Sequence, residues 1–207
     1  MPKIALTYFD SAGRAEPVRV ALHIAGIPFE DRRLPYAEYG RLRAEGAFPL
    51  NAVPLIEVDG VVMTQTTAML RYVARLGATK LYPSDPMAGF IVDSAMETVN
   101  DTLSHALAPS FRERDMEKKL AMRAELVAGP MRLCLAYLEG LLEQTGGPFF
   151  GGVTLTIADL VVGQQLEQVL AGGLDGVTEA VLEPTPRLRE LVDAYRQHPS
   201  IIAYRAR

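Results

Sequence analysis

The distribution of apolar residues changes near residue 80, and this change constrains the fold more than any other feature of the chain. Before that point, short apolar runs typical of strands alternate with stretches of helical periodicity. Asp59-Gly60 separates two of the runs and is a strong signal for a two-residue hairpin turn. The order β-α-β and then β-β-α predicts a mixed sheet with helices packed on it. The expected strands cover residues 3–9, 29–34, 54–58 and 61–64, and the expected helices cover 16–25, ended by Gly26, and 66–76.

Beyond residue 80 no stretch is typical of a strand. The prolines and turn residues of 81–86 indicate a linker between a first domain, 1–80, and an all-helical second domain, 87–207. Thr156 and Asp159 have the spacing of an N-cap residue and its capping-box partner. Helical periodicity covers 87–108, 116–145 and a last helix at about 186–197, with breaks expected at Pro109 and Gly146-Gly147-Pro148.

The overall composition excludes several classes of partner. The 207 residues carry a formal charge of −4 with a pI near 5.5, and no basic stripe is present to attract nucleic acid. No apolar run reaches the ~18 residues of a membrane span, and we expect neither a membrane anchor nor a signal peptide. The single Cys134 excludes an intrachain disulfide, and His23, His105 and His198 lack metal-ligand spacing. We therefore expect a cytoplasmic protein without a metal site.

Tyr8 lies near the end of the first expected strand, and we expect it to face the start of the first helix. A tyrosine hydroxyl stays protonated at neutral pH, so it can donate a hydrogen bond to a nearby thiolate. Lowering a thiol pKa by two units takes about 2.7 kcal/mol, which is within reach of a hydrogen bond to a charged group helped by a cation such as Arg14. Two alternatives stay open: Tyr8 is a strand-end aromatic with a solvated hydroxyl, and Arg14 pairs with Glu16.

Two further short stretches have the residues of a peptide-binding site. A cis peptide bond between Val53 and Pro54 would leave the backbone of Val53 free to pair with a bound peptide, although the dipeptide alone favours a trans proline in a loop. Thr66, expected as the N-cap of the helix 66–76, leaves free N–H groups at the helix start where a carboxylate can bind, with Gln65 adding a polar side chain. Plain helix capping is the alternative.

Together, these stretches resemble the glutathione S-transferases, and the resemblance covers essentially the whole chain. It is closest to the tyrosine-type cytosolic classes, especially sigma. The resemblance implies an α/β N-terminal thioredoxin-like domain plus an all-α C-terminal domain, a homodimer, and glutathione as co-substrate for conjugation to soft electrophiles. The motifs that carry it are Leu6-Thr7-Tyr8-Phe9, Gly13-Arg14-Ala15-Glu16, Val53-Pro54 through Gly60, Gln65 through Tyr72, and Thr156-Ile157-Ala158-Asp159.

The resemblance also implies roles for individual residues. Tyr8 would donate to the glutathione thiolate with Arg14 nearby, Val53 before a cis Pro54 would pair with the cysteinyl unit, and Gln65 and Thr66 would hold the γ-glutamyl group. Asp101 would reach the glutathione of the partner subunit, unless it is an acid on a solvated helix face. The electrophile pocket would be lined by Phe9, Ala12, Gly13, Leu103, Leu107 and Tyr204.

The chain departs from the family pattern at the glycyl end of glutathione. Tyr39 stands where a tryptophan is common, Arg43 replaces a frequent lysine, and Ala52 replaces a polar residue that often contacts glutathione. Tyr39 and Arg43 remain candidates for glycyl binding, and we expect weaker affinity there.

Two other hypotheses for the function of the protein remain open. The first is a non-catalytic member of the same fold that binds glutathione or apolar ligands, or that serves structurally. The second is a thiol–disulfide oxidoreductase, which would need a cysteine at the start of the first helix. That segment reads Phe9-Asp10-Ser11-Ala12-Gly13, so the second reading is the weaker.

Overall fold

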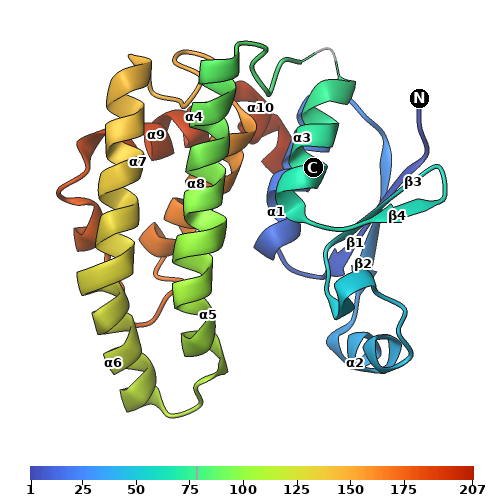
Figure 1. Cartoon of the computed structure of the whole chain (residues 1–207), viewed down its shortest axis with the longest axis horizontal. Helices are drawn as coiled ribbons and strands as arrows, with labels where there is room; N and C mark the ends of the chain where they lie inside the picture. Colours follow the sequence, from blue (N-terminus) through green and yellow to red (C-terminus); the bar gives the residue numbers. More distant parts are fainter. Residues whose placement is uncertain (78) are drawn as a thin grey trace. The chain divides into compact units, whose positions relative to one another are not determined.

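A computed structural model describes residues 1–77 and 79–207, and the chain divides into two compact units (Figure 1). The sheet unit consists of Met1–Leu81 together with Tyr204–Arg207, and the helical unit consists of Tyr82–Ala203. Ala78, near the end of the expected first domain, lies outside the described residues. The last four residues therefore belong with the sheet unit and not with the helices that precede them.

The sheet unit contains one mixed four-stranded sheet with the order β2-β1-β3-β4. β1 runs parallel to β2 and antiparallel to β3, and β3 and β4 form an antiparallel hairpin. Asp59 and Gly60 connect that hairpin with φ values of 49° and 86°, the left-handed pair that a type I′ turn requires. The predicted mixed sheet is confirmed. The strands are β1 (Ile4–Phe9), β2 (Phe29–Leu34), β3 (Leu55–Val58) and β4 (Val61–Met63).

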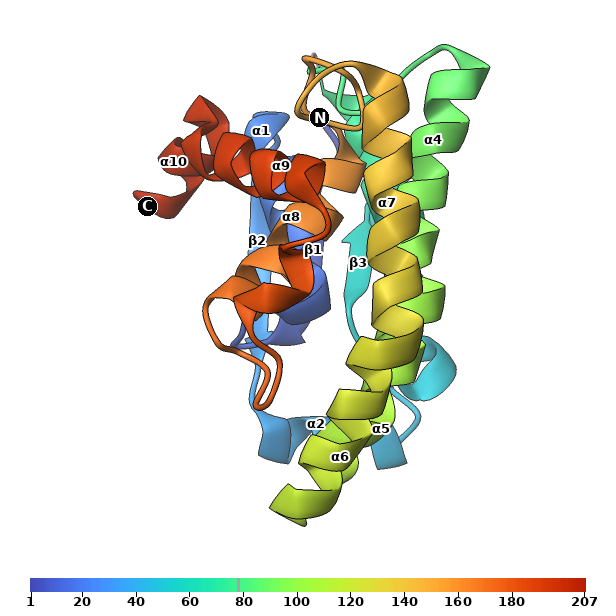
Figure 2. The ribbon, with the colours of Figure 1, turned by 90° about the vertical axis from the view of Figure 1, so that its left-hand side faces the viewer.

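Two helices of the sheet unit match the predicted apolar stripes, and one helix has no such signal. α1 (Glu16–Ile24) and α3 (Thr66–Leu76) pack against each other through buried residues such as Val18, Leu70 and Val73. α2 (Tyr36–Ala44) buries none of its residues and lies beyond the strand ends in both views (Figures 1 and 2). Without a buried face it has no apolar stripe, so the sequence pattern did not predict it. Short 3₁₀ turns precede α1 and β3, η1 (Gly13–Ala15) and η2 (Pro49–Asn51).

The helical unit is built from long helices, and α7 runs alongside α4 in Figure 2. The predicted helix over 186–197 is confirmed, but Pro199 begins a further helix, α10, that carries the chain back to the sheet unit. The remaining elements are α4 (Pro86–Glu97), η3 (Thr98–Leu103), α5 (Ser104–Arg112), α6 (Met116–Leu126), η4 (Val127–Met131), α7 (Arg132–Thr145), α8 (Ile157–Leu170), η5 (Glu179–Leu182), α9 (Pro186–Gln197) and α10 (Pro199–Arg205).

The expected break at Pro109 is wrong, because this proline lies inside α5. A proline in a helix leaves the carbonyl four residues earlier without a donor, and here that residue is the exposed His105. Water can therefore satisfy its carbonyl, and the helix continues to Arg112. The break at Gly146 is confirmed, since Gly146 ends α7 with a left-handed φ of 70°.

The predicted capping box at the start of α8 is confirmed, and it lies in the core. Thr156 donates its N–H and its hydroxyl to Asp159 Oδ2 at 2.6 and 2.7 Å. The N–H of Phe150 donates to Asp159 Oδ1 at 2.9 Å. Asp159 is 0% exposed, and this burial raises the pKa of its carboxyl to about 7 against the opposing effect of the hydrogen bonds that the carboxylate accepts.

Candidate active site

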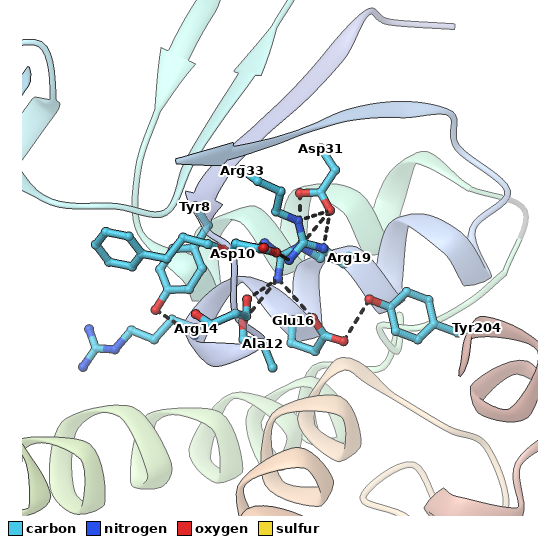
Figure 3. A network of polar contacts seen from close by, with 11 residues as sticks. Tyr8, Asp10, Ala12, Arg14, Glu16, Arg19, Asp31, Arg33 and Tyr204 are labelled. Atoms are coloured by element: carbon cyan, nitrogen blue, oxygen red, sulfur yellow. Dashed lines mark hydrogen bonds and ion pairs between the residues drawn. The ribbon is translucent and has the colours of Figure 1, made fainter. Parts of the chain in front are cut away.

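Tyr8 lies on β1 one residue past its ladder with β3, whose last pair joins Thr7 to Leu55. Its hydroxyl lies beside Gly13 and accepts a hydrogen bond from the backbone N–H of Arg14, with an N···O distance of 3.3 Å (Figure 3). A Cβ at Gly13 would lie 2.5 Å from Tyr8 Oη, and Gly13 has a φ of +44°. Glycine is therefore required for the loop to approach the phenol this closely.

The phenol proton of Tyr8 remains available for an incoming acceptor. Across residues 1–77 and 79–207, the hydrogen bond at Tyr8 Oη is the one it accepts from Arg14, and no protein acceptor takes its proton. A hydroxyl that accepts from one donor becomes a better donor itself, because neighbouring hydrogen bonds polarise one another. Tyr8 can therefore donate to an anion brought to the end of β1.

Arg19 holds the loop that separates Tyr8 from Arg14. Its side chain is 1% exposed, and its guanidinium donates to the carbonyls of Phe9, Ser11 and Ala12 at 3.4, 2.8 and 3.3 Å (Figure 3). The same group pairs with Glu16 and with Asp31 at 3.1 Å each. These acceptors offset the cost of removing the guanidinium charge from water. The hydrogen bonds to the three carbonyls fix the backbone of the loop.

A contact from the other end of the chain completes this network. The hydroxyl of Tyr204 donates to Glu16 Oε1 at 2.9 Å (Figure 3). The ring of Tyr204 also lies edge-on to His23. Burial and the neighbouring Glu16 carboxylate raise the pKa of Tyr204. Tyr204, predicted to line the electrophile pocket, thus has its hydroxyl held within the sheet unit by Glu16.

The sequence interpretation missed Arg19 as a functional residue, although a signal was present. Ala15, at the end of η1, and Val18 and Leu22 of α1 form a buried stripe, and Arg19 falls on that stripe. A charged residue at a core-facing helical position is rarely fully buried unless it is paired. A charged residue at a buried helical position, next to a loop of candidate site residues, therefore indicates a side chain that holds the loop in place. We call Arg19 in this role the Arg19 clamp.

The Arg14 side chain is exposed and extends away from the network in Figure 3. The alternative of an Arg14–Glu16 ion pair is wrong, because Glu16 pairs with Arg19. Arg14 contacts Tyr8 through its backbone N–H, which donates a hydrogen bond to the Tyr8 hydroxyl.

The peptide bond between Val53 and Pro54 is cis, as the family resemblance implied. Val53 is half-buried and precedes β3, and neither its N–H nor its carbonyl has a hydrogen-bond partner in the part of the chain that the structure describes. An extended peptide can pair with these two backbone groups in the manner of an added strand.

The start of α3 differs from the prediction by one residue. Gln65, not Thr66, is the N-cap, because the carbonyl of Gln65 accepts the first helical hydrogen bond, from Met69 N at 3.0 Å. Gln65 is exposed and has a φ of 77°, a backbone conformation that non-glycine residues rarely adopt. The N–H groups of Thr66, Thr67 and Ala68 lack helical acceptors and form a site suited to a carboxylate.

α2 presents two of the predicted residues on one face. Tyr39 donates its hydroxyl to the carbonyl of Asn51 at 3.0 Å, which joins α2 to the segment before Val53. Its ring lies edge-on to Phe9 and stacks on Phe48. Arg43 lies four residues further on, so it shares the face of Tyr39, and it is exposed.

Phe9, Ala12 and Gly13 lie together around the Tyr8 loop, where Phe9 also stacks on Tyr36 with ring centroids 4.2 Å apart. Of the predicted residues in the helical unit, Leu103 and Leu107 are buried and Asp101 is exposed on η3.

Some kinds of site are not found in the described part of the chain. No helix there is long and apolar enough to cross a membrane. No group of three or more histidine, cysteine, aspartate or glutamate side chains is placed to hold a metal ion across residues 1–77 and 79–207. Cys134 is a buried free thiol, and burial raises its pKa.

The sheet unit thus combines three features of a thioredoxin-like site for a thiol peptide. They are a free backbone before a cis proline, the open N-terminus of α3, and a phenol with a proton to donate at the end of β1. Glutathione is a small peptide with a thiol at its centre and carboxylates at its ends, so its chemistry fits these features.

The comparisons with known proteins agree with this geometry. The family models "Glutathione S-transferase, N-terminal domain" and "Glutathione S-transferase, C-terminal domain" match residues 4–75 and 100–207. The chain is 34% identical to glutathione S-transferase 1 of Ascaris suum, over 97% of this chain and 94% of that protein. It is 29% identical to S-crystallin 4 of Enteroctopus dofleini, over 99% of this chain and 96% of that protein. The crystal structure of the glutathione S-transferase from Ascaris lumbricoides aligns with a TM-score of 0.80 and 31% identity, covering 99% of this chain and 97% of that one.

The chain therefore belongs to the glutathione S-transferase family, whose co-substrate is glutathione. Its function is that of a glutathione transferase, and the thioredoxin-like and all-helical fold expected from the sequence is confirmed.

Proposed function

We propose that this transferase activates glutathione through Tyr8, whose hydroxyl donates a hydrogen bond to the thiolate. The observation that carries the proposal is that Tyr8 Oη accepts the N–H of Arg14 and keeps its own proton free for an anion. The Arg19 clamp keeps the loop of Arg14 in place, so the phenol is oriented before glutathione binds.

The energy available from this contact is sufficient for catalysis. A hydrogen bond to a charged group contributes about 1.5–3 kcal/mol, and about 2.7 kcal/mol lowers a thiol pKa by two units. A thiol with a pKa of about 8.5 is roughly 3% ionised at pH 7, whereas one with a pKa of about 6.5 is roughly 75% ionised. The reactive fraction rises by about 25-fold.

The proposed glutathione site extends from Tyr8 along the sheet unit. The backbone of Val53, before Pro54, pairs with the cysteinyl unit, and the N–H groups at Thr66 together with Gln65 bind the γ-glutamyl carboxylate. Support comes from the unpaired backbone of Val53 and the left-handed conformation of Gln65 at the helix start. At the glycyl end, the proposed contacts are Tyr39 and Arg43, and Asp101 reaches the glutathione of a partner subunit.

In the proposed reaction the thiolate sulfur attacks an electrophilic carbon and forms a new C–S bond. For an aryl halide, the halide leaves with the electron pair of the broken bond, and the thiol proton has already passed to solvent. The electrophile binds next to the thiolate, beside Phe9, Ala12 and Gly13 around the Tyr8 loop, and the pocket roles of Leu103, Leu107 and Tyr204 stay predictions.

We also propose that the protein is a sigma-like, cytoplasmic homodimer. Apolar side chains are exposed on the edge strand β4, at Val61, Val62 and Met63, and a partner surface can cover them. The helical unit exposes Phe90 and Tyr137 in the same way. A single buried cysteine suits the reducing cytoplasm.

A non-catalytic binding role is the second candidate. It is favoured by the similarity to an S-crystallin and by Ala52, whose methyl group cannot bond the glycyl end. Calorimetric binding of glutathione without turnover of any aromatic halide would favour it over the transferase.

The test of the first candidate is conjugation of glutathione to a generic aromatic halide by the wild-type protein and by Tyr8→Phe. We expect the variant to bind glutathione and to lose at least roughly tenfold in rate at neutral pH. An unchanged rate in Tyr8→Phe would refute the role of the phenol.

A further inference from the structure

The helical unit contains a cavity of about 480 Å³ that is separate from every residue of the proposed glutathione site. One face of α7 forms its floor, and η4, η5 and the segment after η5 form its walls. Its lining is mostly apolar and includes Met131, Leu135 and Val181. A mostly apolar cavity of this size is typical of a site for a small molecule.

Small residues on α7 make room for the cavity. Ala136 and Gly140 lie one turn apart and both line it. A Cβ built on Gly140 would meet no atom within 4 Å, so packing does not require glycine there. Glycine in a helix interior costs about 1 kcal/mol relative to alanine. Gly140 therefore lowers helix stability and leaves the space open.

The cavity is lined by two acidic side chains toward the C-terminal end of α7 and by one basic side chain at the start of α7. Glu139 is 8% exposed, and its two oxygens accept the N–H groups of Arg187 and Leu188 at 2.8 and 2.9 Å. Glu143, one turn further along α7, is exposed and has no ion-pair partner among the residues that the structure describes. Arg132 lies at the opposite end of α7, about 16 Å away at 1.5 Å per residue.

We propose that this cavity binds an elongated amphiphile with a protonated amine. The amine lies at the end with Glu139 and Glu143, and the apolar body runs along Leu135 toward Met131. Two neighbouring carboxylates attract a cation and repel an anion, and the low polarity of the walls strengthens both effects. The apolar body gains roughly 25 cal/mol for each Å² that leaves water. The proposal does not depend on the function proposed for Tyr8.

The test is calorimetric titration of the full chain with decylamine and, separately, with decanoate, which has the same chain length and the opposite charge. Both titrations are made with and without saturating S-hexylglutathione, so that binding near Tyr8 is distinguished from binding in the cavity. We expect decylamine to bind one site per chain, with and without S-hexylglutathione, at least roughly tenfold tighter than decanoate.

Gly140→Leu fills the cavity and should abolish this binding, with Ala136→Leu as a second filling variant if the first does not fold. The matched control is Gly40→Leu in α2, where a Cβ would also meet nothing within 4 Å. Glu143→Gln should reduce the preference for the amine at least about threefold while leaving the fold intact. Glu139 is left unchanged, because it holds the start of α9. Absence of saturable amine binding, tighter binding of decanoate, or unchanged binding in the filled variants would each overturn the proposal.

Discussion

Tyr204 donates its hydroxyl to Glu16 across 188 positions of sequence, with an O···O distance of 2.9 Å. Glu16 in turn pairs with Arg19, which holds the carbonyls of the loop beside Tyr8. The C-terminal end of the chain therefore supports the loop that orients the proposed catalytic hydroxyl. This link lies wholly within the sheet unit.

Tyr204→Phe tests this link. The substitution removes one hydrogen bond to a charged group but leaves Glu16 paired with Arg19, so we expect a loss of about 1 kcal/mol in the free energy of unfolding. We expect glutathione conjugation to fall about two- to fivefold, because the loop is held less firmly. Urea unfolding and kcat/KM are the measurements. Tyr72→Phe, at a half-buried tyrosine whose hydroxyl has no hydrogen bond among the described residues, is the control, and equal effects from both variants would contradict the link.

Arg19→Lys should have a larger effect. Lysine cannot reach the loop carbonyls, Glu16 and Asp31 at the same time, so the two half-buried carboxylates lose part of the positive charge that pairs with them. We expect a loss of about 3 kcal/mol or more and a roughly 10- to 100-fold lower kcat/KM. Arg33→Lys also touches Asp31 but lies at the surface, so it should cost less than about 1 kcal/mol. Stability within error of wild type for Arg19→Lys would show that the clamp is not needed.

Gly13→Ala should displace the Tyr8 phenol. Its Cβ would lie 2.5 Å from Tyr8 Oη, and the backbone there is left-handed. Gly26→Ala is the matched control, because Gly26 also has a positive φ, 65°, but no atom within 4 Å of a new Cβ. Both variants should lose about 1 kcal/mol from backbone strain, and only Gly13→Ala should lose conjugation activity at least roughly tenfold. Retained activity in Gly13→Ala would mean that the position of the phenol is unimportant.

Asp159 should make stability depend on pH. Its folded pKa of about 7 lies above the ordinary 3.8, so the folded state binds an extra proton between these values. The free energy of unfolding should therefore fall as the pH rises from about 4 to 7. Asp159→Asn should be less stable at every pH, since an amide cannot accept from all three donors, and its stability should lack this slope. Urea unfolding at several pH values measures both effects, and parallel curves for the two proteins would contradict the shifted pKa.

The elements that were predicted correctly from the sequence are those that depend on local patterns of residues. The strands around Asp59-Gly60, the helix 66–76 and the pairing of Thr156 with Asp159 all depend on residues close in sequence, and all are confirmed. α2 was missed because it buries no residue and has no apolar stripe. The N-cap at Gln65 was missed because a left-handed glutamine is not expected from local propensity.

The candidate site was only partly predictable for a different reason. Tyr8 and the Val53–Pro54 bond were singled out from short motifs and the family resemblance, whereas the partners of Arg19 come from β1, the loop after it, α1 and β2. The contact of Tyr204 with Glu16 joins residues at opposite ends of the chain. No local pattern encodes such contacts, since they depend on the path of the backbone through the whole fold.

The most direct test of the central claim is the pKa of the glutathione thiol when it is bound. The ultraviolet absorbance of the thiolate, titrated between about pH 5 and 9 on the wild-type complex and on Tyr8→Phe, measures it. We predict a bound pKa about two units below the ordinary value of about 8.5 in the wild type, and a return to near that value in Tyr8→Phe. Equal thiol pKa values in the two complexes would contradict the proposal that Tyr8 stabilises the thiolate.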